Sequence, residues 1–338
     1  MTKIIKDLKK EDYVKIGDAI QNGELVIFPT ETVYGIGADA TNEKAVDSIF
    51  LAKGRANDNP LIVHISNFDM MKDLTEKPNK MEQLLIDAFM PGPFTLILKK
   101  KEKIPDNVSA GLDTVGIRMP DNEIARNIIE YAKTPIAAPS ANLSSRPSGT
   151  KIEDIKEEFD GKVSYIVDGG ETKIGIESTV CKVIDGIPTI LRPGKITPED
   201  IKEVVGIVKL DEHIYKKADG KVESPGMKYK HYAPSCETVM IYSENDNVFL
   251  EEMKKHLKEH TVIIGSKEHE AFFPNYTYLS YGHMNHYDEI SHNIFTLLRK
   301  ADGLKPDLIL IEGVKKEGLG IAIMNRLIRS CSYRYIEK

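Results

Sequence analysis

The sequence contains few cysteines and no long apolar run. Its three cysteines, Cys181, Cys236 and Cys331, lie far apart and form no CxxC pair, so neither a zinc knuckle nor a disulfide framework is indicated. The N-terminus lacks the apolar stretch of a signal peptide, and no segment approaches the roughly 20 apolar residues that span a bilayer. We therefore expect reduced thiols, a cytoplasmic location and no membrane contact.

Several catalytic motifs are also missing. The sequence has no GxxxxGK[ST] loop, no GxSxG, no HExxH and no cysteine with a plausible partner base. These absences exclude a Walker-type ATPase and give no sign of a nucleophile with its base. An active site without a nucleophile would work by positioning its substrates and stabilising charge. Phosphoryl or nucleotidyl transfer between bound substrates needs little more.

Length and charge set broad limits. A chain of 338 residues exceeds the usual size of one domain, so two domains are expected. The hydrophobic content of 41% and the charged content of 29% are those of an ordinary soluble globular protein. A net charge of −6 argues against a dedicated nucleic-acid binder, although it leaves room for a local basic pocket.

Helix and strand patterns alternate through the first 205 residues and predict an α/β domain with a mixed sheet. One helix is expected over Glu43 to Ala52, with Thr41 or Asn42 at its start and Gly54 after its end. Another is expected from a cap at Asp121 through Tyr131, before the polar loop that begins at Pro139. Residues 1–205 are thus predicted to form the first domain.

The second part of the chain follows a long irregular stretch. Residues 206–236 are charged, poor in aliphatic side chains and broken by glycine and proline, which predicts a linker long enough to have a role of its own. From residue 237 to 338, continuous apolar strands alternate with helices and predict a smaller parallel sheet with Rossmann-like winding. No GxGxxG follows its first strand, so a dinucleotide site is not supported.

Cations and hydroxyl groups recur at predicted strand ends of the first domain. They would suit an anionic small molecule. A solvated turn fits Lys53 and Arg55 as well, a Ser/Gly/Pro cluster is often only a loop, and a strand histidine such as His64 is often a core residue. The recurring residues are Lys53, Arg55, Arg118 and Arg192, with the hydroxyls of Thr32, Ser140, Ser148 and Ser178.

Seven ordered blocks carry a family resemblance. They read FPTETVYGIGADA, KGRANDNPLIVHI, PGPFTLIL, VGIRMP, APSANLSSRPSGT, GIESTV and ILRPG. They resemble the successive blocks of the YrdC-like domain. With SPGMKYKHYAP and its α/β tail, the chain resembles the long two-domain form of the threonylcarbamoyl-AMP synthase family over residues 10–338.

The resemblance implies a nucleotidyltransferase. That family joins L-threonine, bicarbonate and ATP into threonylcarbamoyl-AMP (L-threonylcarbamoyladenylate) and releases pyrophosphate. The product would pass to the tRNA threonylcarbamoyl-transfer machinery, which makes t6A at adenosine 37 of certain tRNAs. Mg²⁺ would be held mainly by the ATP phosphates, with no metal ligands from the protein.

The resemblance also implies roles for individual residues. Lys53 and Arg55 would be catalytic and would face bicarbonate and the triphosphate. The L-threonine site would comprise Thr32, His64, Arg118, Ala138 and Ser178. The ATP site would comprise Arg55, Asn59, Thr114, Ser140, Asn142, Ser148, Arg192 and Tyr232.

The linker would fold back over the active site as a lid, with Lys228 or Lys230 near phosphates; a merely tethering linker is the other interpretation. Ala56 follows Arg55 where many relatives carry proline, which would make that loop less rigid without changing a catalytic role.

Two alternative functions remain. A double-stranded RNA or tRNA-binding module would use a basic surface. The net charge and the lack of an RNA-recognition motif count against RNA binding as the main role. Weak RNA binding is compatible with an enzyme. A hydrogenase-maturation carbamoyltransferase also carries a YrdC-like domain, but it would need CxxC pairs and further domains. The C-terminal domain offers no constellation to which the sequence assigns a ligand.

Overall fold

The computed structural model describes residues 1–216, 223–225 and 232–338, and the chain divides into two compact units. The first unit comprises Met1–Ser144, Gly149–Lys173 and Glu177–Lys228; the second comprises Ser145–Ser148, Ile174–Ile176 and Tyr229–Lys338. The sequence assigned the two short segments of the second unit to the first domain. Backbone contacts explain their place, because Ala233 N–H donates to Ser145 O at 2.8 Å within the second unit.

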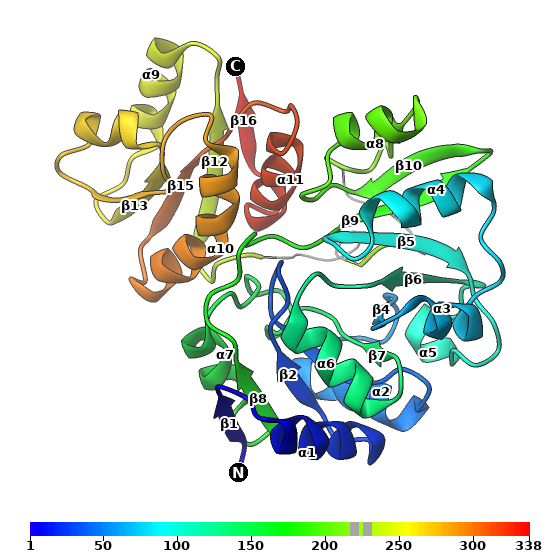
Figure 1. The fold of residues 1–338 in the computed structure, drawn as a ribbon. Coiled ribbons are helices and arrows are strands. Elements are labelled where there is room, and N and C mark those ends of the chain that lie inside the picture. Colours follow the sequence, from blue (N-terminus) through cyan, green and yellow to red (C-terminus); the bar gives the residue numbers. More distant parts are fainter. Residues whose placement is uncertain (217–222, 226–231) are drawn as a thin grey trace. The chain divides into compact units, whose positions relative to one another are not determined.

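A mixed sheet forms the centre of the first unit (Figure 1), as the sequence predicted. Among the described residues it has eleven strands in the order β1-β8-β2-β3-β7-β4-β6-β5-β9-β10-β11. The strands are β1 (Lys3–Lys6), β2 (Val26–Phe28), β3 (Gly35–Asp39), β4 (Ile62–His64), β5 (Phe94–Lys99), β6 (Thr114–Arg118), β7 (Ile136–Ala137), β8 (Tyr165–Asp168), β9 (Thr179–Ile184), β10 (Ile187–Arg192) and β11 (Lys209–Leu210).

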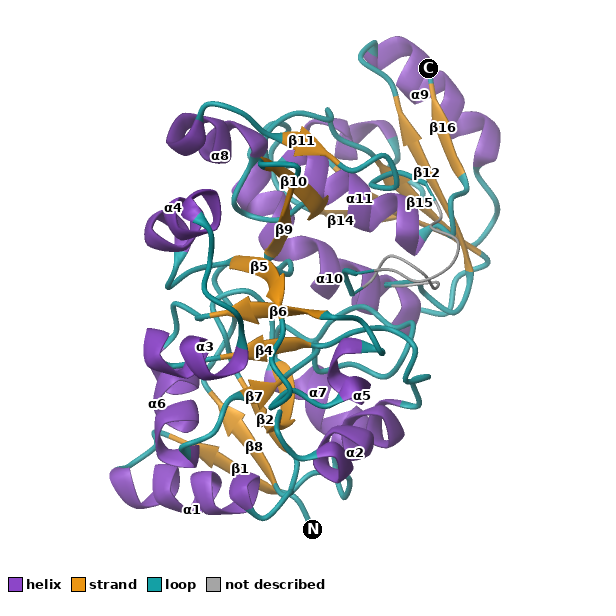
Figure 2. Cartoon of the chain, turned by 90° about the vertical axis from the view of Figure 1, so that its right-hand side faces the viewer, coloured by secondary structure: helices purple, strands orange, loops and turns teal. Residues whose placement is uncertain are grey.

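Helices cover both sides of this sheet. Figure 2 shows α1, α3 and α6 on one side of the strands and α2, α5 and α7 on the other. The helices of this unit are α1 (Lys10–Gln21), α2 (Glu43–Lys53), α3 (Phe68–Leu74), α4 (Lys80–Phe89), α5 (Asp106–Ser109), α6 (Glu123–Ala132), α7 (Ile152–Phe159) and α8 (Pro198–Val205).

Helix ends follow local capping chemistry. Asn42 Oδ1 accepts the Ala45 N–H at 3.3 Å at the start of α2, and Gly54 ends that helix with a left-handed φ of 60°, so both predicted boundary signals are confirmed. The predicted cap at Asp121 is wrong. Asn122 caps α6 instead, because its Oδ1 accepts the Ala125 N–H at 3.0 Å.

Strand β3 was not predicted because it contains Gly35 and Gly37, which are typical of turns. It pairs antiparallel with β2 on one side and β7 on the other. A Cβ on Gly37 would lie 2.6 Å from both Ile136 Cγ2 and Phe28 Cε1. The glycine is therefore needed for the neighbouring side chains to approach this central strand.

The second unit has its own sheet, and its pairings are parallel, as predicted. Among the described residues its strand order is β14-β13-β15-β12-β16. The elements are β12 (Glu237–Tyr242), α9 (Asp246–His256), β13 (Thr261–Gly265), the short helix η1 (Lys267–Phe272), β14 (Thr277–Ser280), α10 (Tyr287–Gly303), β15 (Leu308–Glu312), α11 (Gly320–Ser330) and β16 (Tyr335–Glu337).

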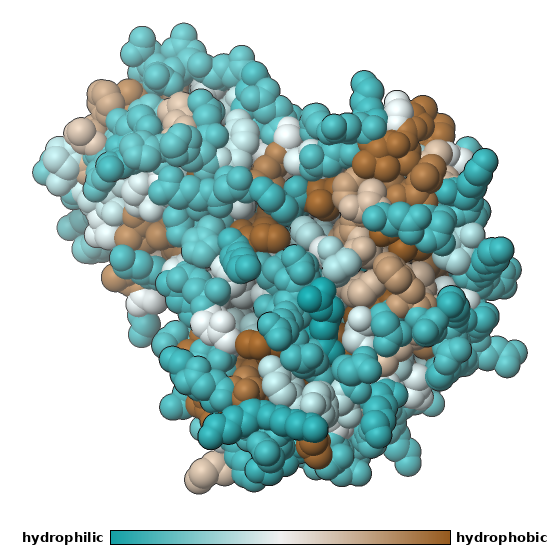
Figure 3. Space-filling model, viewed as in Figure 1, coloured by the Kyte–Doolittle hydropathy of each residue, from teal (hydrophilic) through white to brown (hydrophobic). Residues whose placement is uncertain are grey.

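The surface is mixed in polarity. Figure 3 shows apolar side chains gathered over α4, β10 and α8, a region that includes the exposed residues Leu84 and Val204. In the part of the chain that is described, we find no helix with the length and apolar character of a membrane span.

Gly17 lets helix α1 lie close to the end of α6. A Cβ at this position would be 2.6 Å from Tyr131 O, a backbone atom that a rotamer change cannot move. Alanine is the better helix former by about 0.5–1 kcal/mol, but overpacking costs about 1–3 kcal/mol, so the clash should dominate. We expect Gly17→Ala to lower the melting temperature by several degrees in a thermal scan.

Gly303 provides the matched control, because a Cβ there meets no atom of the described residues within 4 Å. Gly303→Ala should leave the melting temperature unchanged or raise it slightly. Equal melting temperatures for Gly17→Ala and the parent protein would contradict the close approach of the two helices.

Candidate active site

Part of the candidate site lies on one face of four neighbouring strands, β4, β6, β5 and β9. His64 pairs with Arg118, and the antiparallel register that pairs Ile97 with Gly116 puts Thr95 beside Arg118. Because side chains alternate across a strand, residues so paired share a face. Two rows result: His64, Arg118, Thr95 and Val180 in one, and Ile62, Gly116, Ile97 and Lys182 in the other.

The opposite face of these strands is apolar and lies in the main core, which includes Val63, Ile117, Leu96 and Cys181. The sequence predicted polar groups at strand ends; the register adds that they share one face. Gly116 lies at the middle of that face and leaves room for its neighbours, since a Cβ there would be 3.1 Å from Thr95 Cγ2 and 3.3 Å from Ile97 Cδ1.

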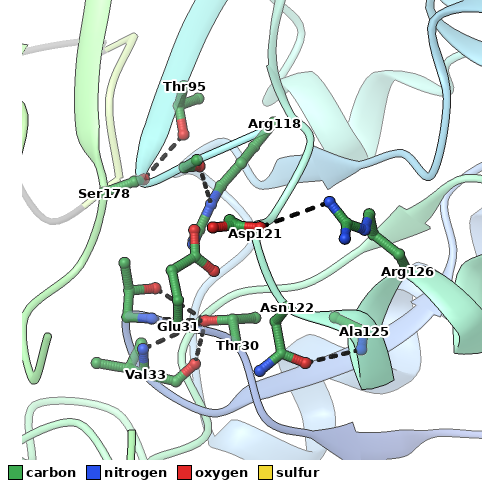
Figure 4. Close-up of polar contacts among 12 residues, drawn as sticks. Thr30, Glu31, Val33, Thr95, Arg118, Asp121, Asn122, Ala125, Arg126 and Ser178 are labelled. Atoms are coloured by element: carbon green, nitrogen blue, oxygen red, sulfur yellow. Dashed lines mark hydrogen bonds and ion pairs between the residues drawn. The ribbon is translucent and has the colours of Figure 1, made fainter. Parts of the chain in front are cut away.

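A buried ion pair between Arg118 and Glu31 dominates the face (Figure 4). The Arg118 Nη2 atom lies 2.7 Å from Glu31 Oε1, and only 5% and 6% of the two side chains are exposed. Arg118 Nε also donates to Gly92 O at 3.4 Å. Neither Glu31 oxygen makes a hydrogen bond of normal geometry to a described residue, so this carboxylate has acceptor capacity for a ligand.

Threonine hydroxyls flank this pair. Thr30 Oγ1 donates to Val33 O at 2.6 Å and lies 2.9 Å from Thr32 Oγ1. Since Thr30 has one hydroxyl proton, Thr32 must donate to Thr30, which leaves the Thr32 oxygen as an acceptor. Figure 4 shows the Thr30 turn below the Glu31 carboxylate.

Arg192 fixes the position of Ser178. Its Nη2 donates to Ser178 O at 2.9 Å and to Ser178 Oγ at 3.1 Å. The Ser178 hydroxyl also lies 2.8 Å from Thr95 Oγ1, as Figure 4 shows. The predicted residues Arg118, Ser178 and Arg192 therefore come together through the β5–β9 pairing.

His64 is neutral on this face. Burial, and then the positive charge of Arg118, lowers the His64 pKa to about 3. Its Nδ1 atom makes no hydrogen bond to a described residue. A neutral imidazole can donate through one ring nitrogen and accept through the other, which suits a ligand hydroxyl.

Lys53 lies under the loop after β7. Its buried Nζ donates to Ser140 O at 2.5 Å and to Asn142 O at 2.6 Å, and Ser140 Oγ donates to Asn142 Oδ1 at 2.6 Å. These contacts give Lys53 a part in positioning the loop. Its predicted contact with bicarbonate and phosphate stays a prediction.

Arg55 and Asn59 share a second loop. Arg55 Nη2 donates to Asn59 O at 3.1 Å. The Asn59 side chain is fully buried, yet neither its Nδ2 nor its Oδ1 finds a hydrogen-bond partner among the described residues. An unsatisfied buried amide is costly, so a ligand that completed its hydrogen bonds would bind well here.

The described part of the linker contacts the same face. Glu223 Oε2 accepts from Lys182 Nζ at 2.6 Å and from Thr114 Oγ1 at 3.5 Å, and Arg192 Nη1 donates to Pro225 O at 3.5 Å. These are contacts that a covering segment would make. Lys228 and Lys230 lie outside the described residues, and the lid stays a prediction.

The remaining candidates are placed as follows. Ala138 N–H donates to Ile62 O at 3.0 Å, beside the two rows. Ser148 and Tyr232 belong to the second unit, where the Tyr232 ring stacks on Phe295 with centroids 4.9 Å apart. Their contact with a nucleotide therefore stays a prediction.

Sequence reasoning missed Glu31, Thr30 and Thr95 as site residues. Glu31 stands between two threonines in FPTET, but a glutamate in a turn is usually exposed, so its pattern gave no sign of burial. Thr95 belongs to an apolar strand, FTLIL. Only the register that puts it beside Arg118 and Ser178 reveals its part.

The fold and site define an α/β protein with a polar face that suits a small zwitterionic or anionic ligand. Arginines and hydroxyls line the face, and a carboxylate stands beside Arg118. Cys181, the cysteine nearest to Ser178 in sequence, lies in the apolar core. Burial raises the pKa of its thiol to about 12, so it is no nucleophile at neutral pH.

Comparisons with known proteins name the family. The family described as "Telomere recombination" matches residues 18–194, and that described as "Threonylcarbamoyl-AMP synthase, C-terminal domain" matches residues 196–332. The threonylcarbamoyl-AMP synthase of Pyrococcus abyssi is 44% identical over 323 residues, covering 94% of this chain and 93% of its own. That of Bacillus subtilis is 40% identical over 320 residues, covering 94% and 92%.

A solved structure agrees with the sequence matches. The P. abyssi Sua5 protein complexed with L-threonine has a TM-score of 0.92 at 41% identity, covering 100% of both chains. The chain therefore belongs to the threonylcarbamoyl-AMP synthase family. The resemblance and the fold class expected from the sequence are confirmed.

Glu31→Gln tests the buried pair. Removing one partner of such a pair leaves an uncompensated buried charge and costs about 3–5 kcal/mol. We expect Glu31→Gln to lower the melting temperature strongly, and a carboxylate ligand on Arg118, such as L-threonine, to restore part of it. The measurement is thermal unfolding with and without L-threonine.

Glu76→Gln is the control, because the Lys99–Glu76 pair lies in the same unit with both side chains more than half exposed. It should change stability by less than about 1 kcal/mol. The buried-pair account would be wrong if both variants melted alike.

His64 should make stability depend on pH. Its pKa is about 3 in the folded protein and about 6.5 when unfolded, so the unfolded chain binds the extra proton and stability falls as pH drops through this window. At pH 5 the loss through this group is about 2 kcal/mol. Denaturant unfolding measures the free energy of unfolding at pH 7 and at pH 5. Between these pH values, His64→Gln should lose less stability than the parent protein. Replacing the exposed His260 with glutamine should leave the parent's loss unchanged.

Proposed function

We propose that the protein is an L-threonylcarbamoyladenylate synthase. It makes threonylcarbamoyl-AMP and pyrophosphate from L-threonine, bicarbonate and ATP, for t6A at adenosine 37 of tRNAs. The observation that carries this proposal is the Arg118–Glu31 pair, set among hydroxyls on one sheet face. Relatives at 40–44% identity that bear the synthase name, and a relative's structure complexed with L-threonine, support it.

L-threonine would bind through its two charged ends. Arg118, which pairs with Glu31 at 2.7 Å, would take the carboxylate, since a guanidinium can bind a carboxylate through two parallel hydrogen bonds. The Thr32 oxygen and the Glu31 carboxylate would accept from the amine. The neutral His64 imidazole would contact the substrate hydroxyl, with Ser178 and the backbone of Ala138 closing the site.

The amine must lose a proton before it reacts, because an ammonium ion has no lone pair. Glu31 is the carboxylate that the described residues place beside Arg118, and we assign it the proton. The neutral amine then forms a bond to the carbon of bicarbonate, water leaves, and a carbamate results.

ATP would lie on the cationic side of the face. Arg55 and Arg192 would stabilise its phosphates, with Asn59, Thr114, Ser140, Asn142, Ser148 and Tyr232 as further contacts. Guanidinium, amide and hydroxyl groups suit phosphate oxygens rather than a metal ion, so Mg²⁺ would arrive on the phosphates and supply charge neutralisation there.

The second step joins the two substrates. A carbamate oxygen attacks the α-phosphorus, the bond to the β-phosphate bridging oxygen breaks, and pyrophosphate leaves with the negative charge. Arg55 and Arg192 stabilise that charge, and a closed linker would keep water from the mixed anhydride. In the cytoplasm, the product would pass to the tRNA threonylcarbamoyl-transfer machinery.

The direct test is pyrophosphate release from ATP and Mg²⁺ by the purified protein. Release should require both L-threonine and bicarbonate and should fall when L-serine replaces L-threonine. Release that required neither would overturn the substrate assignment. No release with all substrates present, together with salt-sensitive tRNA retention on a filter, would favour the RNA-binding alternative.

Arg55 and Lys53 should respond differently to alanine. Arg55→Ala removes a half-buried guanidinium, so we expect turnover to fall about 100-fold or more with little change in melting temperature. Lys53→Ala removes the donor to two buried carbonyls, at about 1–3 kcal/mol for each, so it should also destabilise the fold. Near-parent turnover in both variants would contradict their catalytic assignment.

A further inference from the structure

The sheet of the second unit has a topological switch point between β15 and β12. Strand β12 leads through α9 to β13, whereas its neighbour β15 leads through α11 to β16 in the opposite direction along the sheet. Right-handed crossovers then put the two helices on opposite faces. Ligands of parallel α/β sheets bind at such a switch point, outside the carboxyl ends of the strands.

A cavity of about 220 Å³ lies at this position. It is lined by residues at and just after the ends of β12 and β15, including Tyr242, Glu244, Glu312 and Lys315. Pockets for drug-sized ligands are about 300–1,000 Å³, so the occupant of this cavity is smaller.

A carboxylate paired with a histidine forms the floor. Glu312 is 4% exposed; its Oε1 lies 3.0 Å from His269 Nδ1, and its Oε2 accepts the Ser266 N–H at 2.7 Å. Each carboxylate oxygen can accept a second hydrogen bond. The Phe249 ring stacks on His269, with centroids 4.8 Å apart, and closes one side.

Tyr281 adds a buried hydroxyl to the lining. The side chain is fully buried, and its hydroxyl interacts with the Glu312 carboxylate. Burial and then the Glu312 charge raise the Tyr281 pKa well above 10, so the group is a neutral phenol. The phenol oxygen can still accept a hydrogen bond from a ligand.

The charge of the lining selects the ligand. Glu244, Asp246 and Glu312 are acidic, while Lys315 pairs with Glu317 at 2.9 Å. The hydrogen bond to Glu312 raises the pKa of His269, which offsets only part of this acidic charge. Phosphates and carboxylates are therefore disfavoured. Tyr242, Phe249 and Tyr281 present aromatic rings, which attract organic cations.

We propose that this cavity binds a small organic ammonium ion with an apolar or aromatic body. The ammonium group lies against Glu312, the Tyr281 hydroxyl completes its hydrogen bonding, and the body packs among Tyr242 and Phe249. This site is independent of the proposed synthase reaction.

Three compounds of similar shape but different charge test the proposed amine site on the full-length protein. Calorimetry with 2-phenylethylamine, 2-phenylethanol and phenylacetate should show binding of the amine at least about tenfold tighter than that of the alcohol, and no binding of the acid. Saturating L-threonine and ATP should leave amine binding unchanged. Equal binding of the three compounds, no binding of the amine, or displacement by L-threonine would each overturn the proposal.

Two variants assign the binding to this cavity. Glu312→Gln should weaken amine binding about tenfold or more, and Tyr281→Phe, which removes one oxygen and keeps the ring, should weaken it less. Glu237→Gln is the matched control, because Glu237 begins β12 at the other end of the sheet, where it pairs with Lys258. Glu237→Gln should bind the amine as the parent protein does. Unchanged affinity for the amine in both Glu312→Gln and Tyr281→Phe would overturn the proposal.

Discussion

The buried charge of Arg118 is the constraint on which the site depends. A charged side chain that is only 5% exposed must be paired, and in the structure Glu31 pairs with Arg118 at 2.7 Å. The pairing draws the turn after β2 to the end of β6. In the proposed reaction, Arg118 would bind the substrate carboxylate and Glu31 would accept the proton of the amine.

Strand alternation separates this polar face from the core. In β4, β6 and β5, successive residues face the site and the apolar core in turn. Each of these short strands therefore contributes side chains to both the site and the core. Gly116 lets the side chains of Thr95 and Ile97 approach the middle of the face. Arg192 extends the face from β10 by holding Ser178, and the described linker residue Glu223 pairs with Lys182 at its margin.

Much of this arrangement could be predicted from the sequence. The α2 boundaries, with Thr41 or Asn42 at the start and Gly54 at the end, were predicted from local chemistry, and the structure selects Asn42 and Gly54. Strand β3 was missed because its glycines serve a close approach that only the neighbours Phe28 and Ile136 explain. Glu31 and Thr95 were missed because burial and register are long-range properties, and an acidic turn residue or a strand threonine gives no local sign of either. The Glu312 cavity depends on strand order, which the sequence of the second unit does not state.

The most direct test of the account is calorimetric binding of L-threonine and of L-threoninamide, which lacks the carboxylate, to the parent protein and to Arg118→Gln. The account predicts that the parent protein binds L-threonine much more tightly than the amide, and that Arg118→Gln loses this preference. Equal binding of the acid and the amide by the parent protein would contradict the assignment of Arg118, and with it the proposed site.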